Sequence, residues 1–174
     1  MTRQEKTKRL TVSAMLSALG VIFLWLGSAV EVVDISMAVI ASLLCVIAVI
    51  EYGGSAPWLI FGATATLSLL LLPQKTPAVM YLVFFGYYPI LKEKLERKNK
   101  LTAWIFKEIV FNAALAILLV ASHYLLLVAI PVESVILYYG ALVVMAEIAF
   151  PLYDVALTRL ISFYLFRLRK RFRF

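Results

Sequence analysis

The segment KEKLERKNK, residues 92–100, contains five of the chain's 17 Lys and Arg residues and lies between two long apolar stretches. Four more precede Leu10, and six lie from Arg159 onward. The remaining two are Lys75 and Lys107. Lys and Arg accumulate in the cytoplasmic loops of membrane proteins, because positively charged flanks resist translocation. The distribution therefore predicts an integral membrane protein with both termini in the cytoplasm.

Composition indicates the same class of protein. The chain has 174 residues, of which 64% are hydrophobic, and its mean hydropathy is +0.96. Soluble domains contain roughly 45–50% apolar residues, so most of this chain needs lipid as its solvent. The net charge of +7 does not indicate a nucleic-acid partner, because the basic residues flank apolar segments instead of forming a face on a soluble domain. We expect the basic tail, residues 159–174, to contact anionic lipid headgroups.

The apolar stretches predict an all-α integral membrane protein with six membrane-spanning helices in one domain: residues 10–27, 35–50, 55–72, 78–91, 103–128 and 134–158. Several are shorter than the roughly 20 residues that cross a bilayer, which predicts tilted helices or helices covered by their neighbours. The loops expected outside the cell contain one basic residue, Lys75. The hairpin at residues 51–54 has none, so its cytoplasmic placement rests on alternation alone. Pro89 and Pro151 are expected to kink or stop helices near their inner ends.

Residues that usually carry catalysis are scarce. One His and one Cys, Cys45, are too few for a transition-metal site, which needs three or four such ligands. The chain contains no glycine-rich phosphate loop followed by Lys-Ser or Lys-Thr, and no Gly-flanked Ser nucleophile. We therefore expect no enzyme activity, no metal and no cofactor, and we assign any nucleotide hydrolysis to another subunit.

The first span carries small residues one helical turn apart. Ser13 lies over Ser17, and Ala14 lies over Ala18. Small side chains let helices approach closely in a bilayer, where no hydrophobic effect separates a helix from lipid. Two interpretations are open: packing inside this protein, or a docking face for another protein.

Ionisable side chains inside a membrane are costly and mark candidate functional positions. Glu147 lies about 20 Å along the last span at 1.5 Å per residue, and a functional role is favoured there over a hydrogen-bonded helix contact. Glu108 and Asn112 lie four residues apart, on one face of the fifth span. For Glu108, an ion pair with Arg159 at the inner end of the helices is favoured.

A second group of polar and aromatic residues gathers at the predicted outer ends of the helices. Converging aromatic rings with a few charges are typical of a small-ligand pocket. Tyrosines are also common at membrane interfaces without binding a ligand. Together with Glu147, the candidate ligand-binding residues are Glu31, Asp34, Tyr81, His123, Tyr124, Tyr138 and Tyr139, with Lys75 and Glu133 nearby.

Several features together resemble the substrate-binding S-components of energy-coupling factor (ECF) vitamin transporters. They are the basic entry KTKRLT at residues 6–11, the pattern AMLSA at 14–18, the opening DIS at 34–36, and six spans in about 170 residues. The resemblance implies a six-helix, S-component-like bundle that binds a vitamin-like micronutrient near its outer face. By the same resemblance the loop at residues 28–34 is the lid of that pocket.

The resemblance also implies partners. Ala14 and Ala18 match the first-helix alanine motif, which in that family packs on a transmembrane coupling subunit, while two cytoplasmic ATPases supply the energy. The chain shows no motif of the riboflavin, thiamine, biotin, folate or cobalt branches, so the substrate is unassigned. The charged loop at residues 92–100 and the basic C-terminal extension depart from the family's pattern.

The alternative is a non-transporting six-helix scaffold of cell-envelope assembly, similar to the rod-shape factor MreD. On that interpretation the small residues of the first span and the basic tail make protein and lipid contacts, and the outer polar residues enclose nothing. An outward cavity of a few hundred Å³ lined by His123, Tyr138 or Tyr81 would favour transport. A filled bundle would favour the scaffold.

Overall fold

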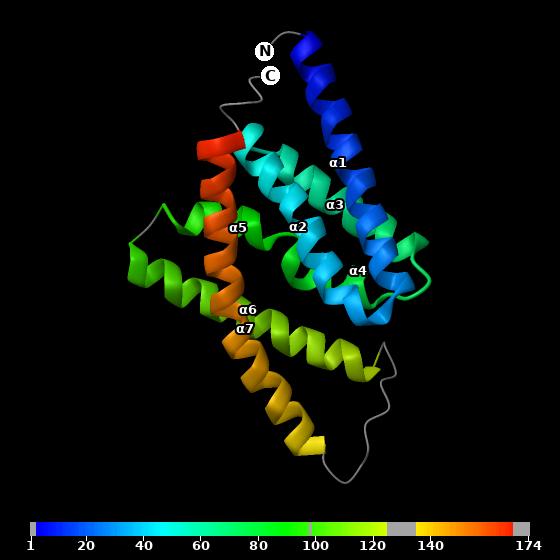
Figure 1. Ribbon diagram of the computed structural model, residues 1–174, viewed down its shortest axis with the longest axis vertical. Helices are drawn as coiled ribbons and strands as arrows, with labels where there is room; N and C mark the ends of the chain where they lie inside the picture. The colour runs from blue at the N-terminus through cyan, green and yellow to red at the C-terminus, as the bar shows by residue number, and fades with distance from the viewer. Residues whose placement is uncertain (1–2, 98, 125–134, 169–174) are drawn as a thin grey trace. The chain divides into compact units, whose positions relative to one another are not determined.

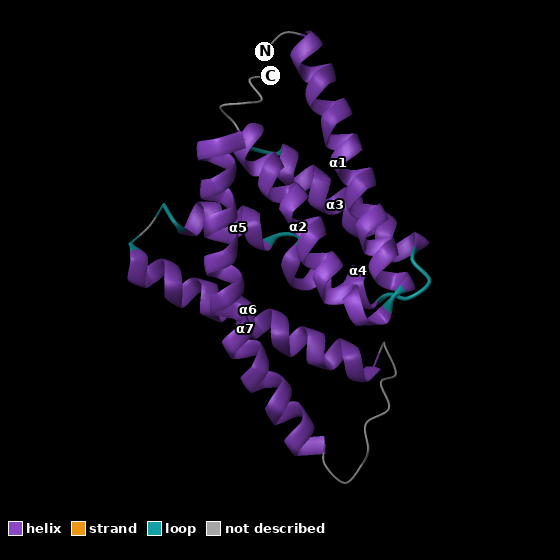
Figure 2. Ribbon diagram, viewed as in Figure 1, coloured by secondary structure: helices purple, strands orange, loops and turns teal. Residues whose placement is uncertain are grey.

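The structure is a computed structural model that describes residues 3–97, 99–124 and 135–168. Within these ranges all regular structure is helical, and no strand is present (Figure 2). The all-α class predicted from the sequence is therefore confirmed. Residues 125–128 and Ser134, which were predicted to be helical, lie outside the described ranges.

Most of the described residues form α-helices (Figure 1). They are α1 (Arg3–Ala29), α2 (Asp34–Glu51), α3 (Ala56–Leu71), α4 (Thr76–Met80), α5 (Tyr88–Leu95), α6 (Lys100–Tyr124) and α7 (Val135–Phe163). A 3-10 turn covers Glu31–Val33, and π-helical segments cover Tyr81–Phe85 and Tyr164–Leu168. Each predicted span coincides with helical residues. α1 begins earlier than predicted and includes most of the basic N-terminal region.

Four helices among the described residues are long and apolar enough to cross a membrane: Arg3–Ala29, Asp34–Glu51, Lys100–Ser122 and Tyr138–Phe166. They indicate a membrane protein. The sequence predicted six spans, and the difference lies in the third and fourth. α3 is apolar but has only 16 residues, because Pro73 follows its C-terminal end closely. The fourth predicted span is divided into α4, a π segment and α5.

Two residues account for the division of the fourth span. The backbone N–H of Gly86 donates to the carbonyl oxygen of Tyr81 at 2.7 Å. This hydrogen bond joins residues five apart, as in a π-helix, and it widens the helix locally. Pro89, which has no N–H group, then lies in the first turn of α5. The break thus falls directly before Pro89, which was expected to kink or stop a helix, and proline is tolerated in the first turn of α5 because a first-turn N–H needs no partner. Pro151 lies inside α7, which continues through it.

α1 packs against α2 and α3 (Figure 1), and small residues let the helices approach closely. Ser13, Ser17 and Gly20 are buried on one face of α1. A Cβ atom at Gly20 would lie 2.9 Å from Cγ2 of Thr64 on α3, so the two helices approach closely there. The hydroxyl of Thr64 donates to the carbonyl oxygen of Ser17 at 3.4 Å. Close approach of small faces is how helices associate in a bilayer.

The connection between α2 and α3 is a tight turn. Gly53 and Gly54 have φ angles of +57° and +60°, in the left-handed region that favours glycine. This confirms the turn that the sequence predicted.

Internal contacts divide the chain into two compact units, residues 1–127 and residues 128–174. The first unit contains α1 to α6, and the second contains α7. The core of the first unit is built from α1, α2, α3 and the segment from α4 to the π turn. Its buried members are Leu24, Ala38, Ala41, Cys45, Ala48, Ile60, Ala65, Leu72, Ala78 and Tyr81.

Candidate functional site

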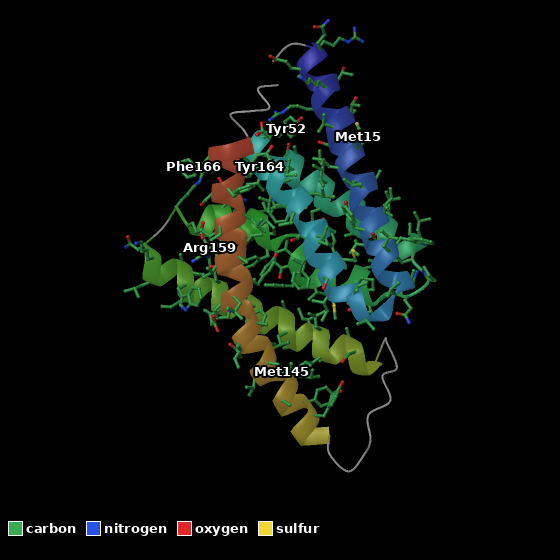
Figure 3. The ribbon with its side chains drawn as sticks, viewed as in Figure 1. Met15, Tyr52, Met145, Arg159, Tyr164 and Phe166 are labelled. Carbon is green, nitrogen blue, oxygen red and sulfur yellow. The ribbon has the colours of Figure 1, made fainter. Side chains whose placement is uncertain are left out.

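The two pairs of small residues on α1 have different surroundings. Ser13 and Ser17 are buried in the first unit, whereas Ala14 and Ala18 are exposed. The packing interpretation therefore holds for the serines. The alanines form a narrow exposed strip of small side chains along α1, which internal packing leaves uncovered. Met15 is exposed as well (Figure 3) and borders this strip, because residues three apart, here Met15 and Ala18, are neighbours on a helix surface.

At the end of the first unit that the sequence predicts to be outside, α1 is tied to the connection between α3 and α4. The buried hydroxyl of Ser28 donates to the carbonyl oxygen of Gln74 at 3.0 Å and accepts from the N–H of Gln74 at 2.9 Å. A carboxylate oxygen of Asp34 accepts from the N–H of Ile35 at 2.6 Å, at the start of α2. The start of the predicted lid, residues 28–34, is therefore anchored to a neighbouring segment.

Tyr81 occupies the core of the first unit. Its side chain is 0% exposed, and its hydroxyl lies 3.1 Å from Sγ of Cys45 on α2. The ring of Phe61 on α3 packs against it, with the ring centroids 6.0 Å apart. Tyr81 thus connects its own segment to α2 and α3, and its side chain is packed on all sides. Sequence spacing alone does not indicate the pairing with Cys45.

The other predicted ligand-binding residues lie on three different elements. Glu31 is in the 3-10 turn, and His123 and Tyr124 are in the last turn of α6; the side chains of these residues lie outside the described part of the structure. Tyr138 and Tyr139 begin α7, where their rings meet edge to face with centroids 5.9 Å apart. Glu147 is half-buried on α7, in the second unit. Glu133 lies outside the described residues, and a pocket shared by all these residues stays a prediction.

The opposite end of the first unit holds a cluster of charges that the sequence analysis missed. Nζ of Lys92 lies 2.7 Å from Oε1 of Glu96, and Nζ of Lys107 on α6 lies 2.9 Å from the same oxygen. Lys92 is 0% exposed and Lys107 is 4% exposed. Partial burial raises the pKa of Glu96, but the hydrogen bonds and charges of both lysines outweigh it and hold that pKa below its ordinary value. This cluster, Lys92–Glu96–Lys107, joins α5 to α6.

A sequence signal for part of this cluster was present. Lys92 and Glu96 are four residues apart, the spacing of an ion pair on one helix face. The pairing of Lys107 with Glu96, at the end of α5, has no such signal, because the two residues are eleven apart and lie on different elements. Glu108 and Asn112 share a face of α6, as predicted, and the Asn112 amide donates to the Glu108 carbonyl oxygen at 3.1 Å. Arg159, the partner predicted for Glu108, belongs to the second unit.

A polar cleft of about 630 Å³ lies beside this cluster. It is formed by the end of α2, the turn that follows, and α5, and its lining residues are Val49, Ile50, Glu51, Tyr52, Gly53, Gly54, Pro57, Ile90, Glu93, Lys94 and Arg97. Tyr52 marks its position at the end of α2 (Figure 3). The Arg9 guanidinium of α1 donates to the Tyr52 carbonyl oxygen and lies 5.3 Å from the centre of its ring.

The cleft brings three regions to one end of the first unit. The basic start of α1, the turn at residues 51–54 and the charged end of α5 all meet there. Alternation of the predicted spans requires these three regions to lie on the same side of a membrane. The turn, for which the sequence offered no charge signal, thus lies at the same end of the first unit as basic residues of α1 and α5, and its cytoplasmic placement stays a prediction.

The chain matches no protein-family model, no curated protein and no solved structure. Within residues 3–97, 99–124 and 135–168, no group of three or more His, Cys, Asp and Glu side chains is placed to hold a metal ion. The features of the described residues are therefore those of a helical membrane protein with an exposed small-residue strip on α1 and a charged cleft at one end.

Proposed function

We propose that this chain is a membrane-embedded subunit that binds a small organic solute and depends on separate coupling and ATPase subunits for uptake. Both termini lie in the cytoplasm in this proposal, where the basic clusters meet anionic headgroups. The solute is a vitamin-like micronutrient by resemblance to ECF S-components. Its pocket is formed by the outer polar and aromatic residues.

The observation that carries this proposal is the division of α1 into two faces. Ser13, Ser17 and Gly20 supply the small face that the protein uses for its own packing. Ala14 and Ala18 supply a second one, which is exposed. A helix that contacts only lipid on its outer side does not need small residues there. Close approach of another membrane helix does require them. This strip is where the coupling subunit docks in our proposal.

Replacing Ala14 or Ala18 with Trp should abolish copurification with the coupling and ATPase subunits, because an indole ring holds a partner helix away from the strip. We expect at least a tenfold loss of copurified subunits from native membranes in mild detergent, measured by quantitative mass spectrometry. Leu19→Trp is the matched control, since Leu19 is 40% exposed and lies about 100° or more around α1 from both alanines. Equal recovery of the partner subunits with Ala14→Trp and wild type would rule out the docking role.

Solute binding is tested separately by mass spectrometry of small molecules retained by the purified protein. One organic molecule should be enriched in wild type and in Ala14→Trp alike, because the pocket and the strip are separate sites. The scaffold of cell-envelope assembly is the second candidate. It is favoured by the packing of Tyr81 against Cys45, because Tyr81 is fully buried and a filled bundle is what the scaffold predicts. The scaffold predicts that neither a small molecule nor an ATPase subunit copurifies.

A further inference from the structure

The polar cleft at the end of α2 has a charge pattern that the proposed function does not use. Four of its lining side chains are of the kinds that carry a charge near neutral pH: Glu51, Glu93, Lys94 and Arg97. Two carry negative charge and two carry positive charge, so the cleft is polar without net charge. A simple anion-binding site would lack the two carboxylates, and a simple cation site would lack the Lys and the Arg. The pattern fits a ligand that carries both signs of charge.

The two positive charges of the cleft, Lys94 and Arg97, lie on α5 and on the turn that follows it. Nζ of Lys94 lies 5.5 Å from the centre of the Trp58 ring, a cation–π contact that holds the ammonium at the mouth of the cleft. Arg97 is paired with Glu93 one turn earlier, and the Arg97 side chain is 76% exposed. Exposed ion pairs of this kind contribute little, so a phosphate can take the place of the carboxylate without a large penalty. Arg and Lys together are a common phosphate-binding pair.

The negative half lies at the end of α2. Glu51 is the last residue of that helix and is exposed on the cleft wall. The adjacent Tyr52 is held by Arg9, which donates to its carbonyl oxygen. Arg9 therefore ties α1 to the residue that follows Glu51.

The position of the cleft selects a lipid over a soluble ligand. α2 is a candidate membrane span, and Glu51 lies where its apolar segment ends, at the level of the headgroups. α3 contributes Pro57 to the cleft, and the next two residues of that helix, Trp58 and Leu59, are exposed, with exposed fractions of 41% and 61%. Trp is enriched at membrane interfaces, and exposed leucine accommodates an acyl chain. A charged head in the cleft and apolar tails along α3 match this surface.

We infer that this cleft binds the headgroup of a zwitterionic aminophospholipid. The phosphate lies against Lys94 and Arg97, and the primary ammonium donates hydrogen bonds to Glu51. This assignment is independent of the docking strip on α1 and of any solute.

The test uses the full chain, purified in detergent and freed of lipid, with phosphatidylethanolamine, phosphatidylcholine and phosphatidylglycerol of identical acyl chains. Native mass spectrometry measures the dissociation constant of each lipid. We expect phosphatidylethanolamine to bind about tenfold more tightly than phosphatidylcholine, whose quaternary ammonium has no N–H donor for a charge-assisted hydrogen bond. Equal dissociation constants for the three lipids would overturn the assignment.

Two substitutions separate the halves of the cleft. Glu51→Gln should remove the preference for phosphatidylethanolamine, whereas Lys94→Gln should raise the dissociation constants of all three lipids several-fold. Glu5→Gln and Lys100→Gln are the charge-matched controls, since both residues are exposed and neither lines the cleft. An unchanged preference in Glu51→Gln would contradict the inference. Glycerophosphoethanolamine, which lacks acyl chains, should compete only at far higher concentration, and competition at the lipid's own concentration would show a site for a soluble headgroup instead.

Discussion

Glu96→Gln should lower the free energy of unfolding by about 2 kcal/mol, because it removes the negative charge that both Lys92 and Lys107 contact. Breaking a fully buried ion pair costs about 3–5 kcal/mol, and breaking an exposed one costs about 0–1 kcal/mol. The lysines are buried, whereas the Glu96 side chain is 42% exposed, so an intermediate value is expected. Chemical unfolding of the detergent-solubilised protein measures the change.

Glu93→Gln is the matched control for this substitution. Glu93 also pairs with a cation at a spacing of four residues on the same short segment, but its partner Arg97 is largely exposed. We expect a change below about 0.5 kcal/mol for this exposed pair. Equal destabilisation by the two substitutions would show that burial of the lysines contributes nothing.

The contribution of Glu96 should also disappear in acid. The pKa of Glu96 is lowered in the folded protein from its ordinary value of 4.5. A depressed carboxyl pKa contributes stability that is fully present above the unfolded-state value and is lost as the pH falls through the folded-state pKa. The difference in unfolding free energy between wild type and Glu96→Gln should therefore be constant near neutrality and shrink below pH 4.5. A difference that persists unchanged well into the acid range would contradict this origin.

Gly86→Ala should destabilise the protein by about 2 kcal/mol through overpacking. A Cβ atom at Gly86 would lie 2.6 Å from Cδ2 of Phe61 and 2.7 Å from Cε1 of Tyr81. Both are atoms of aromatic rings that pack against each other, so neither can move aside independently. The backbone of Gly86 is in the ordinary helical region, so the loss comes from this contact and not from the φ angle.

Gly62→Ala separates this contact from the general effect of glycine in a helix. A Cβ atom at Gly62 meets nothing within 4 Å. Alanine there should stabilise α3 by about 0.5–1 kcal/mol, because glycine loses more backbone freedom on folding. Thermal unfolding of the two variants in the same detergent should therefore shift the midpoint in opposite directions. A gain in stability for Gly86→Ala would contradict the close approach at the π turn.

The apolar stretches predicted well where the helices lie, because their positions follow directly from residue types, but they predicted six spans where four helices are long and apolar enough to cross a membrane. The interruption of the fourth span was only partly predictable. Pro89 indicated a break, but the widened turn before it depends on the fit of Gly86 beside Phe61 of another helix. A contact of that kind involves residues far apart in the chain, and no local pattern encodes it.

The candidate site was predictable to a smaller extent. The spacing of small residues on α1 identified two strips, yet nothing in the spacing distinguished the buried Ser13–Ser17 pair from the exposed Ala14–Ala18 pair. The sequence analysis placed Lys92 among the charges of a cytoplasmic loop, whereas the Lys92 side chain is fully buried against Glu96. Burial of a charge depends on the partner that another segment brings, here through Lys107 of α6.

The double hydrogen bond between Ser28 and Gln74 limits how the connection between α1 and α2 can move. It attaches the C-terminal end of α1 to the chain just after α3. A movement of this connection that leaves both hydrogen bonds intact is confined to residues 29–33, which lie between Ser28 and the start of α2. Five residues of backbone, and not a displacement of the first helix, then set its extent.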